Sequence, residues 1–457
     1  MSKVILKGGT IWTADSVYVA DIFIQDGIIK TIGQDIQYQA DEVIDLAGKI
    51  VMPGGVDVHT HLDAPVGETT TIDDFASGTV AAACGGTTTI VDFATQQKNQ
   101  GLVETVEMWH EKAADKAVID YGFHISVTDL YEGSMTDLGK VVDSGVTSFK
   151  IFMDYPDTLM LDDGEIFRVL QAGGRYGAKV CVHASNGKVI DRIAEDLVYQ
   201  GKTGPEGHLL SRPPATEVEA VNRAIAISRM ADAPLYFVHL STEGAAYALA
   251  EAKDHEWPVD GETCTHYLTL DKELYFKPDF EGAKAVLTPP LAGEKDRDAL
   301  WKGLRTGSLS IVSSDHCPFC FEQKKIGIDD FRRIPNGGSG IEHRIQLMYA
   351  DGVVAGRLTP QQFVDIVSTA PAKAFGMYPQ KGQIAIGSDA DITVIDPDGV
   401  TKISAETHNM RTDYSLWEGW ERAGRIVRVF SRGEEIVRDG VYVGAAGRGS
   451  YLKRRTI

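Results

Sequence analysis

The chain has 457 residues and carries 45 Lys and Arg against 65 Asp and Glu, a formal net charge of −20. This length allows two or three domains, or one large α/β barrel with an appended domain. The acidic balance argues against nucleic-acid binding, because no basic stripe is available to replace phosphate counterions. No apolar run approaches the roughly 20 residues of a membrane span.

The N-terminus and the cysteine content indicate a cytoplasmic protein. Residues 1–7 are strand-like and lack the long apolar stretch of a signal peptide. Five cysteines are too few and too scattered for a disulfide framework, which fits a reducing compartment. Cys317 and Cys320 have C-x-x-C spacing, which can mark a redox or zinc motif. No second such pair accompanies them, which favours two incidental thiols.

Both ends of the chain are typical of β-structure. Short alternating runs such as 19–24 are followed by turn signals such as Asp26-Gly27, and the same texture returns at 391–395 and 426–430. We expect residues 1–54 and 375–457 to form one small β-domain together.

The middle of the chain, residues 55–374, alternates short β-branched runs with longer helical stretches such as 217–230 and 360–368. The expected strands are 55–61, 87–93, 121–127, 147–153, 179–183, 235–240, 259–264 and 309–315. Eight such units predict a (β/α)8 TIM barrel, whose active site lies at the C-terminal ends of the strands.

Four histidines and an aspartate end expected strands. His59 and His61 lie two residues apart, so both imidazoles share one face of their strand. His183, His239 and Asp315 each follow an apolar run. A lone histidine in such a place is commonly structural. Several at the same end of separate barrel strands favour a centre for zinc or a similar divalent ion.

Lys150 lies within the apolar strand 147–153 and has two interpretations. The local sequence favours a lysine that extends its amine from the strand end. Alternatively, CO2 adds to the amine and gives a carbamate, N6-carboxylysine, which has two oxygens and can bridge two metals. Charge supports the second interpretation, because two divalent cations among neutral imidazoles and one aspartate need a further anion.

A pair of metal ions would activate water at neutral pH and polarise a substrate carbonyl. Asp315 would bind one ion and carry a proton from the nucleophile to the leaving nitrogen.

Four motifs stand out along the chain: Pro-Gly-Gly-Val-Asp-Val-His-Thr-His at 53–61, Gly-Gly-Thr-Thr-Thr at 85–89, Thr-Ser-Phe-Lys at 147–150 and Ser-Asp-His-Cys at 314–317. Together they resemble the cyclic-amidohydrolase family, in particular its hydantoinase/dihydropyrimidinase branch and the bacterial D-hydantoinases. The similarity extends over essentially the whole chain.

The resemblance implies a TIM barrel with a β-sandwich formed by both termini, usually as a homotetramer. It implies a binuclear zinc centre, sometimes accepting manganese or cobalt, with N6-carboxylysine at position 150. The implied metal ligands are His59, His61, Lys150, His183, His239 and Asp315.

The same resemblance implies ring opening of 5-substituted hydantoins and dihydropyrimidines to N-carbamoyl amino acids, with D-selectivity. Tyr155 would stabilise the oxyanion, and main-chain groups at Thr288 and Asn336 would hold the substrate amide. The substituent would meet apolar loop residues, which by position are Leu62, Val66, Phe152 and Leu159. An alternative is an allantoinase or dihydroorotase, which shares the metal set, and a remote one is a non-catalytic dihydropyrimidinase-like scaffold.

Two positions depart from the family pattern. The family usually reads His-Ala-Glu-Asn where this chain has His183-Ala184-Ser185-Asn186, so a carboxylate beside the ligand is lost. Asp154 stands where many relatives have a small apolar residue. The basic end, 448–455, is expected to form a subunit-contact arm or a solvated tail.

Overall fold

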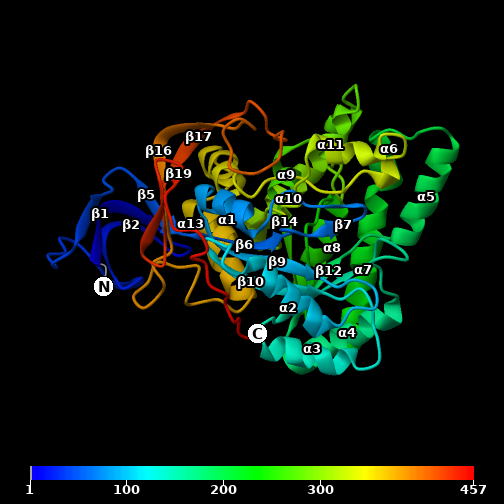
Figure 1. Ribbon diagram of the computed structural model, residues 1–457, viewed down its shortest axis with the longest axis horizontal. Helices are drawn as coiled ribbons and strands as arrows, with labels where there is room; N and C mark the ends of the chain where they lie inside the picture. The colour runs from blue at the N-terminus through cyan, green and yellow to red at the C-terminus, as the bar shows by residue number, and fades with distance from the viewer. Residues whose placement is uncertain (1–2, 457) are drawn as a thin grey trace.

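Eight short strands pair in parallel and close into a barrel (Figure 1), in a computed structural model that describes residues 3–456. The strands follow one another in chain order around the sheet, and a bridge between Thr60 and His316 joins the last strand to the first. The barrel strands are β6 (Gly55–Thr60), β9 (Thr87–Thr95), β10 (Asp120–Ser126), β11 (Ser148–Phe152), β12 (Lys179–His183), β13 (Leu235–Phe237), β14 (Val259–Cys264) and β15 (Ile311–Ser313).

The barrel strands are apolar on both faces because both faces are covered. In β12, Val180 and Val182 join the cluster that packs under the helices, whereas Cys181 between them joins a separate inner cluster. This alternation follows from the two-residue period of a strand.

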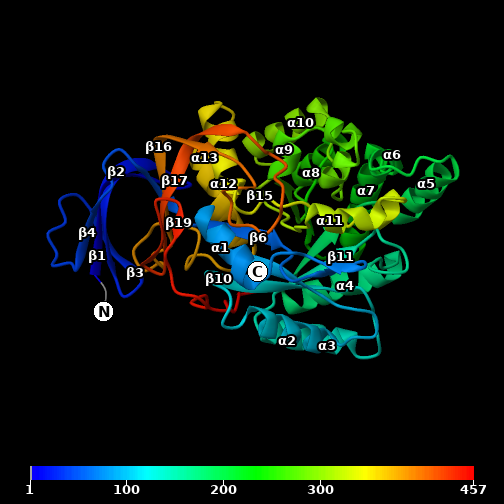
Figure 2. The ribbon, with the colours of Figure 1, turned by 45° about the horizontal axis from the view of Figure 1, so that its top comes forward.

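Helices cover the outside of the barrel (Figure 2) and connect its strands. They are α1 (Phe75–Cys84), α2 (Leu102–Ala113), α3 (Ser134–Asp143), α4 (Asp163–Tyr176), α5 (Gly187–Tyr199), α6 (Glu206–Ser211), α7 (Pro214–Ala231), α8 (Glu243–Asp254), α9 (Thr265–Thr269), α10 (Glu294–Thr306), α11 (Phe321–Lys324), α12 (Arg344–Leu347), α13 (Pro360–Val364) and α14 (Ala370–Ala374). Short 3₁₀ helices are η1 (Lys272–Phe276), η2 (Glu281–Ala285), η3 (Lys325–Gly327) and η4 (Phe331–Arg333), and π-helices are η5 (Met348–Val354) and η6 (Asp365–Thr369). Among the helices within residues 3–456, none combines the length and apolar character needed to cross a bilayer.

The two ends of the chain form a second domain, which lies beside the barrel in both ribbon views. Its nine strands within residues 3–456 are β1 (Lys3–Trp12), β2 (Val17–Gln25), β3 (Ile28–Gly33), β4 (Glu42–Asp45), β5 (Ile50–Pro53), β16 (Ile392–Lys402), β17 (Glu421–Ser431), β18 (Glu434–Arg438) and β19 (Val441–Tyr442). Antiparallel pairing of β5 with β16 joins the N-terminal and C-terminal strands, and Ile22, Val51 and Val394 share its core. A short hairpin, β7 (Pro65–Val66) with β8 (Thr69–Thr70), lies in the loop after β6.

The fold class is confirmed, namely a (β/α)8 barrel with a β-sandwich made from both termini. Each expected barrel strand is present, and among the differences from the expected ends are those at β13, which ends at Phe237, and β15, which ends at Ser313. His239 and Asp315 lie beyond β13 and β15 because both adopt left-handed backbone conformations, with φ of 42° and 47° respectively. The division of the chain at residues 54 and 374 stays a prediction.

The basic end of the chain is not a solvated tail, because it packs on its own barrel. Its role as a subunit-contact arm stays a prediction. The guanidinium of Arg454 is buried and donates to the carbonyl of Phe123 and to Ser148 Oγ, the latter at 2.8 Å. Tyr451 stacks on Phe123 with ring centroids 5.5 Å apart. Apolar and hydrogen-bonding groups of the barrel therefore decide the course of this segment, which its charge pattern did not indicate.

A buried lysine ties the two domains together. Lys381 Nζ lies 2.6 Å from Asp120, 2.9 Å from Asp389 and 2.7 Å from Asp391. Asp120 belongs to β10 of the barrel, whereas Asp391 immediately precedes β16. The ammonium group thus occupies the centre of a carboxylate cluster that would otherwise suit a metal ion, and these carboxylates raise its pKa despite burial.

We expect Lys381→Met to lower the free energy of unfolding by about 3–5 kcal/mol, because it leaves three buried carboxylates without their cation. Urea denaturation measures this change. Lys402→Met, at an exposed position on β16, is the matched control and should stay within about 0.5 kcal/mol of the wild type. Equal effects of the two substitutions would contradict the role of Lys381.

Candidate metal centre

His59, His61 and Asp315 converge at the C-terminal end of the barrel. Oδ1 of Asp315 lies 3.0 Å from Nε2 of His59 and 3.3 Å from Nε2 of His61. The three residues offer ligand atoms that all lie within 4.8 Å of one another. Closure of the barrel produces this cluster, since β6 carries His59 and the loop after β15 carries Asp315.

His183 and His239 form the neighbouring half of the site. Nδ1 of His183 faces Nε2 of His239 at 2.8 Å, and both side chains are buried. The His239 ring lies 5.4 Å from that of His59, which joins the two halves.

Lys150 reaches the same place from β11 and is fully buried. Its Nζ lies 4.5 Å above the ring of Phe93, and that ring also contacts His59 and His61 at centroid distances of 4.7 Å and 5.1 Å. Burial lowers the pKa of Lys150 to about 8. Within residues 3–456, no carboxylate lies within 4.0 Å of this amine to form an ion pair.

Burial and the neighbouring charges shift the pKa values of the site's imidazoles in opposite directions. Burial would lower the pKa of His59, but Asp315 and Glu262 raise it to about 9. Burial lowers the pKa of His61 to about 4 and that of His239 well below its ordinary value. Most of these rings are therefore neutral at pH 7, the form that binds metals.

The residues present fit a divalent cation centre. Nε2 of His59 and Nδ1 of His239 are buried and make no hydrogen bond. Two facing imidazole nitrogens, as in His183 and His239, can share one proton or hold a cation with both lone pairs. Imidazole nitrogens with one carboxylate are the donors that zinc and similar ions prefer.

A buried carboxylate outside the predicted set orients His59. Glu262 Oε1 lies 2.5 Å from Nδ1 of His59, and its other oxygen accepts from Tyr236 Oη at 3.0 Å. This partner directs Nε2 of His59 toward the site, as carboxylates do in many metal centres. The signal in the sequence was a charged residue inside the expected strand 259–264, whose other members are mostly uncharged.

Tyr155, Thr288 and Asn336 are brought together beside the histidines. Nδ2 of Asn336 donates to Tyr155 Oη at 3.4 Å, and the Tyr155 ring lies 5.6 Å from that of His183. Burial raises the pKa of Tyr155 to about 12, with Thr288 and Asn336 as hydrogen-bond partners that oppose the rise. The phenol is thus protonated and able to donate.

Lys324, which sequence reasoning missed, holds the two loops that carry Thr288 and Asn336. It is fully buried, and its Nζ donates to the carbonyls of Val286 at 2.8 Å, Pro335 at 2.6 Å and Gly337 at 2.7 Å. Two of these carbonyls flank Asn336, so one ammonium group links both segments.

The four loop residues expected around the substrate's substituent differ in burial. Phe152 is buried with its ring 5.7 Å from His183, whereas Val66 and Leu159 are partly exposed. Leu62 is fully buried and packs so closely on α1 that a Cβ at Gly78 would lie 2.3 Å from it. Leu62 therefore belongs to the core. Its position after β6 in the sequence did not indicate which way its side chain points.

The C-x-x-C pair does not form a joint site. Residues 3–456 include five cysteines, all free. The thiol of Cys317 faces the carbonyl of Asn336, whereas that of Cys320 faces the carbonyl of Arg411. These separate contacts favour incidental thiols.

Comparisons with known proteins agree with this architecture. The model of the amidohydrolase family matches residues 50–436. The chain is 48% identical over 456 residues to the D-hydantoinase of Geobacillus stearothermophilus, covering 99% of this chain and 97% of that protein. It is 45% identical over 461 residues to the D-hydantoinase of Streptomyces coelicolor, covering 100% and 98%. The crystal structure of the dihydropyrimidinase from Brevibacillus agri has a TM-score of 0.98 at 48% identity, with 99% of both chains covered.

A barrel with imidazoles, a lysine and an aspartate at the C-terminal ends of its strands has the architecture of a metal-dependent hydrolase. The chain belongs to the amidohydrolase family, whose members depend on a dinuclear metal centre.

We expect removal of divalent metal with a chelator to lower the melting temperature of the protein and re-addition of Zn²⁺ to restore it. A ligand at about 1,000 times its dissociation constant stabilises the folded state by about 4.1 kcal/mol. Differential scanning calorimetry measures the shift. A melting temperature unaffected by chelation, in protein shown to contain stoichiometric metal beforehand, would contradict the centre.

Proposed function

We propose that this protein hydrolyses the ring amide of 5-substituted hydantoins and dihydropyrimidines to N-carbamoyl amino acids, with preference for the D enantiomer. The observation that carries the proposal is the convergence of Tyr155, Thr288 and Asn336 beside the histidine cluster, in a chain 48% identical to a D-hydantoinase. The substrate is a small cyclic amide.

We assign the metal centre to two divalent ions, Zn²⁺ first, with Mn²⁺ or Co²⁺ as substitutes. Lys150 would be carboxylated, because a buried amine without a carboxylate partner has the surroundings in which a carbamate can serve as the missing anion. The proposed ligands are His59, His61, carboxylated Lys150, His183, His239 and Asp315.

The metal pair, when bound, supplies an activated water and polarises the ring carbonyl. Asp315 accepts the proton from the water on a carboxylate oxygen and transfers it to the ring nitrogen as the C–N bond breaks. Tyr155 Oη donates to the oxygen on which negative charge develops. Water thus adds its hydroxyl to the carbonyl carbon and its proton to the departing nitrogen.

Main-chain groups at Thr288 and Asn336 orient the substrate amide. Lys324 holds the two loops that carry these residues in a fixed position relative to each other. The substituent meets Val66, Phe152 and Leu159. Because one methylene discriminates by only about 1–3 kcal/mol, several of these contacts must act together in selecting the substituent and its stereochemistry.

Incubation with racemic 5-phenylhydantoin, dihydrouracil, allantoin and dihydroorotate tests the activity, with and without added Zn²⁺ or Mn²⁺. We expect turnover of the first two substrates, loss of turnover after chelation, and N-carbamoyl-D-phenylglycine as the main product on a chiral column. Turnover of allantoin or dihydroorotate alone would overturn the assignment, and an excess of the L product would overturn the selectivity.

Tyr155→Phe should lower kcat by about 10²–10³-fold, the usual loss on removal of one oxyanion donor. Initial rates at saturating 5-phenylhydantoin measure it. Tyr38→Phe, at a tyrosine that is 54% exposed in the β-sandwich domain, is the control and should retain wild-type rates. A Tyr155→Phe enzyme with unchanged kcat would remove the phenol from the mechanism.

We further propose a cytoplasmic homotetramer. Val189, Tyr199, Leu210 and Phe276 expose large apolar surfaces on α5, α6 and η1, which pack beside one another. Burial of these side chains by other copies of the chain would favour assembly.

A further inference from the structure

Asp154 lies buried between the candidate ligand His183 and the candidate oxyanion donor Tyr155. Its Oδ1 accepts a hydrogen bond from the main-chain N–H of Tyr155 at 2.7 Å. Its Oδ2 lies 3.7 Å from Nε2 of His183, and both atoms are buried without a hydrogen bond. The contact is therefore electrostatic, and it joins the ring nitrogen opposite the one that faces His239.

The surrounding structure closes tightly over Asp154. The side chain is 1% exposed. A Cβ at Gly187, the first residue of α5, would lie 2.8 Å from Cα of Asp154. The carboxylate therefore has little freedom to turn away from His183.

Arg212 lies on the other side of the carboxylate. Its Nη2 is 3.9 Å from Oδ2 of Asp154, and its Nη1 donates to Ser211 Oγ at 3.1 Å. In the described part of the chain, Asp154 is the one carboxylate within 4.0 Å of this guanidinium. The carboxylate thus lies between an imidazole and a guanidinium, and both groups favour its anionic form.

We propose that Asp154 is a positioning residue, whose carboxylate keeps the proton of His183 on Nε2 and leaves Nδ1 free to bind metal. This inference rests on the proposed metal centre. A metal-binding histidine commonly has a carboxylate on its other nitrogen, and that partner fixes both the tautomer and the direction of the ring. The same carboxylate holds the backbone of Tyr155, which adopts a left-handed conformation with φ of 62°.

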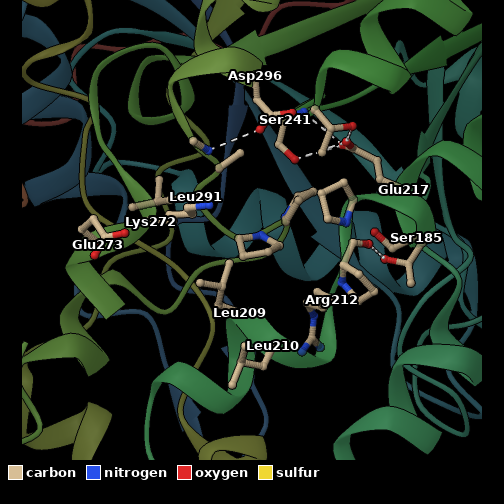
Figure 3. A pocket seen from close by; sticks show the side chains of 18 of the residues that line it. Ser185, Leu209, Leu210, Arg212, Glu217, Ser241, Lys272, Glu273, Leu291 and Asp296 are labelled. Carbon is tan, nitrogen blue, oxygen red and sulfur yellow. Dashed lines mark hydrogen bonds between the residues drawn. The ribbon is translucent and has the colours of Figure 1, made fainter. Parts of the chain in front are cut away.

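The inference connects the two departures from the family pattern. Ser185 stands where a glutamate is expected, and it lines a cavity of about 440 Å³ that Arg212 also lines (Figure 3). The short serine leaves room on that side. Asp154, just after β11, supplies the carboxylate that position 185 lacks, and it faces the same guanidinium.

The test compares the Zn²⁺ affinity of Asp154→Asn with that of the wild type by competition with a chromophoric chelator. The asparagine keeps an acceptor for the Tyr155 N–H but has no charge. We expect the dissociation constant to rise about 10–100-fold. Asp157→Asn is the matched control, because Asp157 is exposed in the same loop and asparagine tolerates its φ of 61°. It should bind Zn²⁺ like the wild type.

The double variant Asp154→Ala/Ser185→Glu tests whether one carboxylate replaces the other. We expect it to regain most of the Zn²⁺ affinity, since the cavity at position 185 accommodates the longer side chain. A double variant that binds as weakly as Asp154→Asn overturns the exchange between the two positions. If Asp154→Asn fails to fold by circular dichroism, Asp154→Ser decides the matter, because the shorter uncharged side chain fits the same space. A weaker Zn²⁺ affinity than that of the wild type supports the positioning role, and an unchanged affinity overturns it.

An unchanged dissociation constant in Asp154→Asn overturns the positioning role, including the case in which only the melting temperature of the metal-free protein falls. Failure of the proposed function looks different. In that case the wild type itself binds no Zn²⁺ and leaves 5-phenylhydantoin intact.

Discussion

Closure of the barrel between β6 and β15 is the constraint on which the site depends. The bridge from Thr60 to His316 and the bond from Ser314 N to Asp57 Oδ1, 3.2 Å long, hold the first and last strands side by side. His59 and Asp315 come from opposite ends of the barrel sequence and meet only through this pairing. Because parallel strands all point the same way, the other candidate ligands are delivered to the same rim.

Three buried lysines differ in the groups that surround their amines. Lys381 has three carboxylates, which raise its pKa, and it joins the two domains. Lys324 donates to three carbonyls and secures two loops, although burial lowers its pKa to about 7. Lys150 has aromatic rings and imidazoles around its amine instead of such acceptors. An amine with few fixed partners suits the carboxylation that we propose for Lys150.

The backbone at the site is held in conformations that non-glycine residues rarely adopt. Tyr155, His239 and Asp315 all have φ between 42° and 62°. Such residues cost about 1–3 kcal/mol each and persist where the surroundings determine them fully. Each directly follows or closely follows a barrel strand, so rigid strands and packed loops supply that support. The left-handed backbone at these three residues directs their side chains toward the site, whereas a continued extended strand would direct them elsewhere.

Local patterns in the sequence were sufficient for the barrel, the two-ended β-domain and the group of strand-end histidines. The alternation of polar and apolar residues and the length of a strand are both visible within a few residues of sequence. The spacing of His59 and His61 alone places both rings on one face of their strand. The partners of these residues were decided by the tertiary structure. Glu262 reaches His59 and Lys324 spans two loops, because these contacts join segments that are adjacent only in the folded barrel. Leu62 turns into the core against α1. Side-chain direction at a loop position and contact across the barrel rim depend on packing, which no local pattern encodes.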